Sequence, residues 1–582
     1  MICGFLHRKE EKIVNGRGEE ILLQGWGLGN WMLAEGYMWR SASPRFDRPR
    51  RIERVIEELA GKDFAAWFWK QFRESYIGRE DIAAMRRLGY NSVRIPFNYR
   101  LFMEDGPGTV WKEEGFLLLD RCLEWCEAEG LYAFLDLHGA PGGQTGSNID
   151  DSVDDVPRLF MDRHCREAAI ALWVRLARRY AGREVVGGYD LLNEPIIPAY
   201  AGNGDFDHLI PELKQFYKDV IREIRRVDKV HLLSLEGPHW ATSVSIFDED
   251  YDDNMVIHFH RYAEPPEIAC LKPYIDAGRQ RKLPLWMGET GENTDRWYAA
   301  LYPLAQSLGV GYNLWPWKKM DCTNSPCSIR RPEGWQEILD YIEGGPHPGY
   351  ARAAKILCEY LENIRYENCI HNDAVTHHVL RCPPFSIQAA DFDSTDAELA
   401  WAYSAAGTAV ADNPAGVLDA SDAAPDNDAG TMAADGAAAA DDPAAAAGSD
   451  AANCPAGTAY RARSGMEIVE LYPRGERRFT FDSGWERFAL VLCPGDGVTY
   501  TFDTTGLPSE KVHITMEYEC EDGGSLAVGC QPGELENKIP LAAGSGEYTV
   551  TVSVVPDTGR KRLFVRGLEG RIRLKTIGWT VD

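Results

Sequence analysis

The sequence predicts an eight-stranded (β/α)8 barrel of the TIM-barrel class, followed by a smaller antiparallel β-sandwich. Between residues 20 and 318, apolar β-rich runs alternate with segments whose apolar residues recur at helical spacing. Eight such runs predict parallel strands with helical crossovers that close into a barrel. From residue 460 onward, short alternating strands and turns are typical of a sandwich. The length of 582 residues allows for both units.

The predicted barrel elements follow one another in strand and helix order. The eight strands are EEILLQGW, YNSVRIPF, LYAFLDLHG, VVGGYDLLNEP, VHLLSLEGP, NMVIHFHRY, LPLWMGETG and VGYNLWPWK. Helical spacing between them is clearest in REDIAAMRRLG, GFLLLDRCLEWCEAEG, REAAIALWVRLARRYAG and PELKQFYKDVIREIRRVD. We therefore assign residues 1–365 to the barrel.

The second unit follows the predicted helix GYARAAKILCEYLENI and a connector at residues 366–382. Residues 383–582 are expected to form the sandwich, with PFSIQAADFDS as its first strand and IRLKTIGWTVD as its last. Residues 404–458 are rich in Ala, Asp, Gly and Pro and offer little apolar surface to bury. This composition predicts a disordered insertion in the sandwich. A plain interdomain linker is the alternative.

Charge and composition exclude several classes of partner. The formal charge of −27 repels nucleic acids and anionic membranes, so neither is expected to bind. No run reaches the roughly 18 consecutive apolar residues of a membrane span, and the first residues lack the apolar core of a signal peptide. We expect a soluble, cytoplasmic protein. The 14 scattered cysteines favour reduced thiols, and Cys322 and Cys327 lack further Cys or His neighbours, so no metal site is expected.

Polar or aromatic residues stand at or just after the C-terminal ends of several predicted strands. They are Arg94, His138, Glu194, His260, Tyr262, Glu289 and Trp315. A packed barrel core does not need polar groups at one rim, whereas the loops at that rim form the binding face of such barrels. For Glu194 alone there is an alternative, a helix start with Asn193 as its cap and Pro195 in the first turn.

Glu194 and Glu289 are the candidates for a pair of catalytic carboxylates. Hydrolysis of a glycosidic bond with retention needs one carboxyl as acid and a second, about 5 to 5.5 Å away, as nucleophile. The ends of strands four and seven can face each other across a barrel mouth. The two carboxyls need different protonation at neutral pH, and mutual repulsion helps, because one anion raises the pKa of the other. We assign Glu289 as nucleophile and Glu194 as acid and base.

The remaining rim residues suit supporting roles. Arg94 can hold Glu289 ionised, and Tyr262 can donate to the same carboxylate. Asn193 offers an amide to the 2-hydroxyl of the sugar. His138 and His260 could orient sugar hydroxyls, and Trp315 could supply a flat apolar floor.

These stretches also carry a family resemblance. The first 365 or so residues resemble glycoside hydrolase family 5 through SVRIPF, DLHGAPG, LLNEP, HFHRY, GETG and LWPWK, in family order. The resemblance implies a TIM barrel and a retaining two-glutamate mechanism without metal or organic cofactor. Its functional positions fall on Arg94, His138, Asn193, Glu194, His260, Tyr262, Glu289 and Trp315. Within HFHRY, His258 is an alternative, but the His-x-Tyr spacing of the family selects His260.

Further motifs resemble particular branches of known families. GWGLGNWMLAEGYMW and LDLHGAPGGQTGSN resemble the exo-β-1,3-glucanase and β-glucosidase branch, in which the glutamate matching Glu35 grips the non-reducing glucose. The C-terminal unit, with IQAADFD, YRARSGMEIVEL and GDGVTYTFD, resembles a carbohydrate-binding module of family 6 or 35. A structural sandwich that buttresses the barrel is the alternative.

Together these observations predict a retaining β-glycoside hydrolase, most simply an exo-acting β-glucosidase or glucan β-glucosidase. Its substrate is expected to be a neutral β-glucoside or β-glucan. An endo-β-glucanase or a transglycosylase would use the same carboxylates, and a glycan-binding protein with an inactive barrel is the alternative from another class. The sequence does not fix the oligomeric state.

Overall fold

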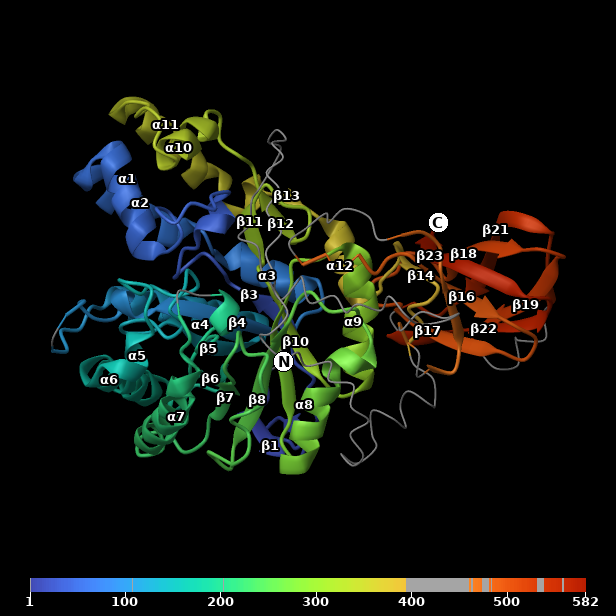
Figure 1. The fold of residues 1–582 in the computed structure, drawn as a ribbon, viewed down its shortest axis with the longest axis horizontal. Coiled ribbons are helices and arrows are strands. Elements are labelled where there is room, and N and C mark those ends of the chain that lie inside the picture. The colour runs from blue at the N-terminus through green and yellow to red at the C-terminus, as the bar shows by residue number, and fades with distance from the viewer. Residues whose placement is uncertain are drawn as a thin grey trace.

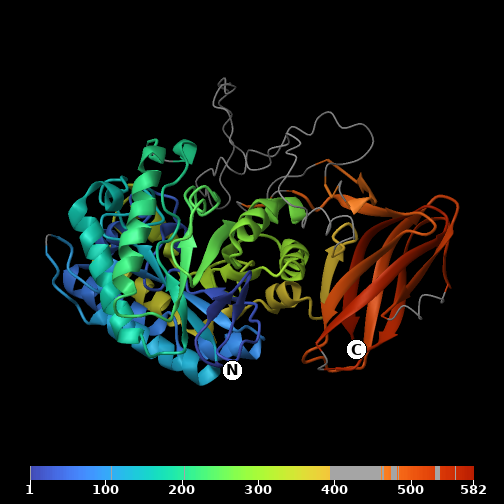
Figure 2. The ribbon, with the colours of Figure 1, turned by 90° about the horizontal axis from the view of Figure 1, so that it is seen from below.

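The computed structural model describes residues 2–106, 108–201, 204–393, 460–461, 464–473, 481–482, 484–530, 538–556 and 559–582. Figure 1 shows a barrel with its helices beside a strand-rich second unit, and Figure 2 shows the same two units from another side. The predicted order of a barrel followed by an antiparallel sandwich is confirmed.

Eight parallel strands close into the barrel, in the spatial order β10-β3-β4-β5-β6-β7-β8-β9. Each lies within one of the eight predicted runs, or within one residue of its end. Their bounds are β3 Gln24–Gly27, β4 Ser92–Asn98, β5 Tyr132–Gly139, β6 Val186–Asp190, β7 Leu232–Glu236, β8 Met255–Arg261, β9 Leu285–Gly291 and β10 Gly311–Trp315. Every residue of β4 and β5 is buried, which explains their nearly continuous apolar character.

The helices between the strands include all four predicted ones: α3 Arg79–Arg87, α4 Glu114–Glu129, α6 Arg163–Tyr180 and α7 Ile210–Ile224. The other barrel helices are α1 Pro49–Ala60, α2 Lys62–Ser75, α5 Arg158–Met161, α8 Ile268–Arg281 and α9 Asp295–Ser307. Both α8 and α9 contain an internal proline, Pro273 and Pro303, which weakens a helical pattern in the sequence. After β10 come α10 Trp335–Ile342, α11 Tyr350–Asn363 and α12 Asp373–Leu380. The expected connector at 366–382 therefore contains a helix.

An N-terminal hairpin closes the barrel at the end opposite the polar rim. Its strands are β1 His7–Lys9 and β2 Lys12–Val14. A separate apolar cluster joins it to residues near the starts of the barrel strands: Leu6, Ile13, Leu23, Tyr132, Phe134, Leu232, Val256 and Trp286. With this end filled by apolar side chains, the carboxyl ends of the strands are left as the functional face.

The sandwich consists of two antiparallel sheets. One has the order β15-β16-β23-β18-β21, with β14 also paired to β23, and the other has the order β17-β22-β19-β20. The bounds are β14 Phe385–Gln388, β15 Glu467–Glu470, β16 Phe488–Leu492, β17 Gly497–Asp503, β18 Lys511–Cys520, β19 Gly524–Gly529, β20 Lys538–Leu541, β21 Gly544–Ser553, β22 Arg560–Glu569 and β23 Ile572–Val581. The predicted disorder at 404–458 lies outside the described residues and stays a prediction. The predicted strand RRFTFDS also falls largely outside them.

The sandwich packs on the α9 side of the barrel, where α9, α12 and β14 contact one another. The Arg381 guanidinium donates to the Ala299 carbonyl at 2.6 Å and pairs with Asp393 at 2.6 Å. The Arg461 backbone N–H donates to Glu267 at 2.9 Å. Arg381, in the connector, therefore binds both units, and the contact between Arg461 and Glu267 joins them directly.

Two further expectations concern the described part of the chain. No helix within it is long and apolar enough to cross a membrane. All thirteen cysteines that the structure describes are free thiols.

Candidate active site

A buried arginine is the centre of the polar rim. Arg94 of β4 is fully buried and pairs with Asp190 at 2.8 Å, Asp136 at 3.0 Å and Glu236 at 3.1 Å. It also forms an ion pair with Glu289. A buried guanidinium needs such partners to offset its desolvation, and it fixes the carboxylates around it in return. The predicted pairing of Arg94 with Glu289 is present.

Glu289 of β9 is surrounded by groups that favour its charged form. Burial alone would raise its pKa, but the positive charges of His260 and Arg94 and the Tyr262 hydrogen bond outweigh this, so its pKa is lowered. The Tyr262 hydroxyl donates to Glu289 Oε1 at 2.6 Å. Glu289 is therefore ionised at neutral pH, as a carboxylate nucleophile must be.

Glu194 stands in a different environment, four residues beyond the end of β6. Burial is the largest influence and raises the pKa of this carboxyl, which a hydrogen bond from His260 only partly offsets. His260 Nδ1 lies 2.7 Å from Glu194 Oε1, and the Glu194 N–H donates to Glu236 at 2.7 Å. The backbone at Glu194 has a left-handed φ of 42°. No helix begins here, so the alternative of Asn193 as a helix cap is wrong.

The two carboxylates meet across the barrel mouth. One oxygen of Glu194, one oxygen of Glu289 and a nitrogen of His260 all lie within 4.8 Å of one another. Retaining glycosidases hold their two carboxyls about 5 to 5.5 Å apart, whereas inverting ones need roughly 6.5 Å or more for a water. The close approach and the opposite pKa directions fit an acid and a nucleophile.

His138, Asn193 and Trp315 form a neighbouring part of the site. The rings of His138 and Trp315 stack almost in parallel, with centroids 5.2 Å apart. Burial opposes the charged form of His138, but the charge of Asp136 and its hydrogen bond outweigh this and raise the pKa to about 9. The side-chain oxygen of Asn193 accepts from Arg94 at 2.8 Å, which orients its amide. Trp315 in turn donates to the Tyr37 hydroxyl at 2.9 Å.

Glu35 also belongs to this cluster and comes from the loop that follows β3. It is 3% exposed, and burial raises its pKa to about 8, with His138, Glu289 and Glu292 as charged neighbours. No described residue bonds to its Oε1. A neutral carboxyl of this kind can both donate to and accept from a sugar hydroxyl.

The structure adds site residues that the sequence analysis did not single out. Asp136, Asp190 and Glu236 form a buried layer beneath the two glutamates, together with His258, which the sequence analysis named only as an alternative to His260. Lys319, Glu292 and Tyr37 form a second group, in which Glu292 pairs with Lys319 and accepts from Tyr37 at 3.1 Å. A sequence pattern could have indicated some of these residues. In LDLHG and HFHRY an acidic or His residue lies inside an apolar strand, two positions from another polar residue and therefore on the same face of the strand.

Two clusters of His and carboxylate side chains have the spacing of metal ligands, Glu236 with His258 and His260, and Glu194 with His260 and Glu289. Cationic groups already occupy this region: Arg94 pairs with Glu236 and Glu289, and a raised pKa favours the charged form of His260. A divalent ion would add charge to a site already balanced by a guanidinium. Cys322 and Cys327 belong to no such cluster among the described residues.

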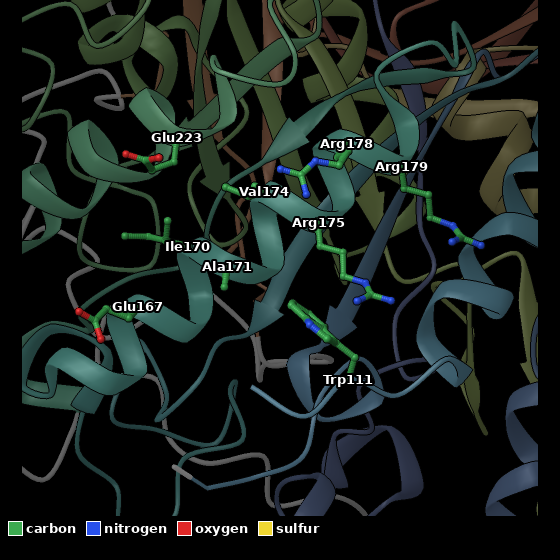
Figure 3. Close-up of a pocket in the computed structure, with 9 residues that line it drawn as sticks. All are labelled: Trp111, Glu167, Ile170, Ala171, Val174, Arg175, Arg178, Arg179 and Glu223. Carbon is green, nitrogen blue, oxygen red and sulfur yellow. The ribbon is translucent and has the colours of Figure 1, made fainter. Parts of the chain in front are cut away.

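A surface groove lies apart from the barrel mouth, on the outer face of α6 (Figure 3). Its lining residues are Trp111, Glu167, Ile170, Ala171, Val174, Arg175, Arg178, Arg179 and Glu223. Two of its arginines are already paired, Arg175 with Glu113 and Arg179 with Asp120. The groove contains none of the rim residues, so we assign the chemistry to the barrel mouth.

Comparison with known proteins identifies one matching family model and several similar sequences. The family model described as "Cellulase (glycosyl hydrolase family 5)" matches residues 58–321. A glucan 1,3-beta-glucosidase of Candida oleophila is 32% identical over 349 residues, which cover 54% of this chain and 77% of that protein. A beta-xylosidase of Phanerodontia chrysosporium is 32% identical over 280 residues, and the match covers 48% of this chain and 56% of that protein.

Two matches at lower identity cover most of the matched protein. Endoglucanase C of Acetivibrio thermocellus is 24% identical over 338 residues, covering 46% of this chain and 93% of that protein. Among solved structures, rutinosidase from Aspergillus niger has a TM-score of 0.42 at 16% identity, over 51% of this chain and 90% of that one.

Proposed function

Because the chain belongs to glycoside hydrolase family 5, we propose that it is a retaining β-glycoside hydrolase with exo-β-glucosidase action on neutral β-glucosides or β-glucans. One observation carries the proposal. Two buried carboxylates with opposite pKa directions approach within 4.8 Å at the carboxyl ends of β6 and β9.

The geometry suits a double displacement. Glu289 attacks the anomeric carbon and forms a glycosyl-enzyme, while Glu194 passes its proton to the leaving glycosidic oxygen. Glu194, now anionic, then removes a proton from the water that breaks the glycosyl-enzyme bond. His260 lies between the two carboxylates and is positively charged, because Glu236 and Glu289 raise its pKa despite burial. It can stabilise Glu194 in the anionic step.

Support for exo action comes from Glu35. This buried carboxyl lies beside His138 and close to Glu289, where it can bind a hydroxyl of a terminal sugar. The similarity to the glucan 1,3-beta-glucosidase of Candida oleophila favours a β-glucoside as substrate. The beta-xylosidase relative makes a β-xyloside the next sugar to test.

The test is release of nitrophenol from a panel of aryl β-glycosides. Wild type should hydrolyse the β-glucoside, and Glu289→Gln should lose at least about a thousandfold in kcat because the nucleophile is gone. Normal turnover by Glu289→Gln would refute the assignment. Circular dichroism of both proteins controls for folding.

An endo-β-glucanase or a transglycosylase is the second candidate, favoured by the similarity to Endoglucanase C. It uses the same carboxylates, so variants at Glu194 and Glu289 do not separate the two. Product sizes from a β-glucan do. Glucose as the first product indicates exo action, and oligosaccharides of mixed length indicate an endo enzyme.

The glycan-binding alternative from another class would require an inactive barrel. The paired carboxylates, each with its own supporting residues, argue against it. Glycan binding by the sandwich is a separate proposal, which rests on the resemblance to carbohydrate-binding modules alone. Binding of β-glucans to the full chain carrying Glu289→Gln, compared with binding of an aryl β-glucoside, would test it.

A further inference from the structure

A residue of the C-terminal unit reaches the catalytic rim. Phe481 precedes β16 in the sandwich sequence, yet its ring lies against Tyr262, with ring centroids 4.6 Å apart and planes tilted by 33°. Tyr262 follows β8 directly and donates to Glu289 at 2.6 Å. One side chain therefore separates the sandwich from the proposed nucleophile.

The backbone of the same residue is also tied to the barrel. Asn293 is buried in the loop after β9 and donates from Nδ2 to the Phe481 carbonyl at 2.7 Å. The same amide nitrogen donates to the Tyr262 carbonyl at 3.0 Å. Asn293 thus holds the two aromatic residues in register through their main chains.

A second contact with the same barrel loop comes from a residue a few positions further on. Thr294 caps the start of α9 and donates to the Glu486 carboxylate. The neighbouring Trp485 is 2% exposed. Phe481 and Glu486 are therefore each bound to the loop that joins β9, which carries Glu289, to α9.

We propose that Phe481 is a positioning residue of the active site, which holds the Tyr262 ring so that its hydroxyl stays on Glu289. A loop side chain keeps a catalytic hydrogen bond only if its own rotamer is locked by packing, and a tilted aromatic contact supplies such packing. The sandwich thereby completes the catalytic centre in addition to any glycan binding. The proposal rests on the role of Glu289 in the proposed function.

The test is a double-mutant cycle on the full-length protein with an aryl β-glucoside. Phe481→Ala should lower kcat/KM about three- to tenfold, the range expected for loss of an aromatic pair. In a Tyr262→Phe background the same change should have almost no effect, because the hydroxyl it positions is absent. Both single variants should also move the acid limb of the pH profile of kcat/KM to higher pH, since Glu289 loses a donor.

Conservative and matched variants complete the design. Phe481→Tyr keeps the aromatic ring and should have the pH profile of wild type. If Phe481→Ala does not fold, Phe481→Leu replaces it in the double-mutant cycle. Glu519→Ala removes an exposed ion pair with Arg573 elsewhere in the sandwich and should stay within about twofold of wild type. Losses that simply multiply for Phe481→Ala and Tyr262→Phe, or an equal loss for Glu519→Ala, would overturn the positioning role.

These outcomes are distinct from a failure of the proposed function. If wild type hydrolyses the glucoside and Glu289→Gln does not, additive effects at Phe481 refute the positioning role alone. If wild type releases nothing from any aryl sugar and leaves β-glucans intact, the proposed function fails and the positioning role fails with it.

Discussion

At the scale of single residues, the environment gives two identical carboxyl groups different tasks. Burial acts on both Glu194 and Glu289 in the same direction, towards a higher pKa. His260 lowers the pKa of both carboxyls, so the difference comes from Arg94 and Tyr262, which bind Glu289. Direct pairing with a guanidinium favours the anion, so Glu289 stays charged while Glu194 keeps its proton more readily.

Because Glu194 acts as the acid, the activity lost on substituting Glu194 should depend on the leaving group of the substrate. Glu194→Gln should reduce kcat/KM by about a hundredfold to ten-thousandfold on an alkyl or sugar glucoside, whose leaving oxygen needs a proton. With dinitrophenyl β-glucoside, an acidic phenol leaves unaided and the loss in the first step should be much smaller. Steady-state kinetics on the two substrates measure this, and equal losses on both would contradict the acid role.

The pH profile should show the same two groups. The lowered pKa of Glu289 sets the acid limb of kcat/KM below the ordinary glutamate value of 4.5, and the raised pKa of Glu194 sets the basic limb above it. Glu194→Gln should remove the basic limb and leave the acid limb. Retention of the basic limb would assign it to another group, such as His138.

Glu35 gives a prediction that depends on its protonation state. Because its pKa is about 8, this carboxyl is mostly neutral at pH 6.5, and Gln is a close neutral mimic of it. At that pH, Glu35→Gln should lose much less kcat/KM than Glu35→Ala, mainly through KM. Equal losses would show that sugar binding needs the glutamate itself.

At the scale of elements, close approach between strands places the aromatic floor. A Cβ at Gly27 in β3 would lie 2.5 Å from the Trp315 ring of β10, and a Cβ at Gly29 would lie 2.7 Å from it. The missing side chains let the indole lie flat on the neighbouring backbone. Strand order thus couples residues almost 300 positions apart, because β10 pairs with β3 in the closed barrel.

Gly27→Ala should therefore displace Trp315 and weaken both stability and catalysis. We expect a loss of about 1 to 3 kcal/mol in the free energy of unfolding, the usual cost of overpacking, with a rise in KM. Gly182→Ala is the matched control, since a Cβ there meets nothing within 4 Å. Denaturant unfolding and kinetics on both variants check this, and equal behaviour of the two would refute the close contact.

At the scale of the whole molecule, buried groups link stability to pH. The folded state raises the pKa of Glu35 from 4.5 to about 8 and that of His138 from 6.5 to about 9. Between pH 6.5 and 9 the folded protein thus binds more protons than the unfolded chain at both residues, and linkage makes the free energy of unfolding fall as pH rises.

The melting temperature should accordingly be lower at pH 9 than at pH 6.5. The free energy of unfolding should fall by more than about 1 kcal/mol over this range, since one unit of pKa shift is worth about 1.4 kcal/mol. Glu35→Gln should reduce the slope between pH 6.5 and 8, because one titrating group is removed. Calorimetry on both proteins measures it. A higher melting temperature at pH 9 would contradict the assigned pKa directions.

The sequence by itself determined the barrel, its eight strands and the two glutamates. Fully buried strands need continuous apolar runs, and a polar residue at the end of such a run is visible without coordinates, as in LLNEP and GETG. The structure alone revealed Asp136, Asp190 and Glu236, because their role comes from meeting Arg94 across three different strands. Only the tertiary structure showed that Phe481, 219 positions after Tyr262, reaches the catalytic rim. Local patterns record which face of an element is buried, whereas contacts between distant units depend on packing, which no local pattern contains.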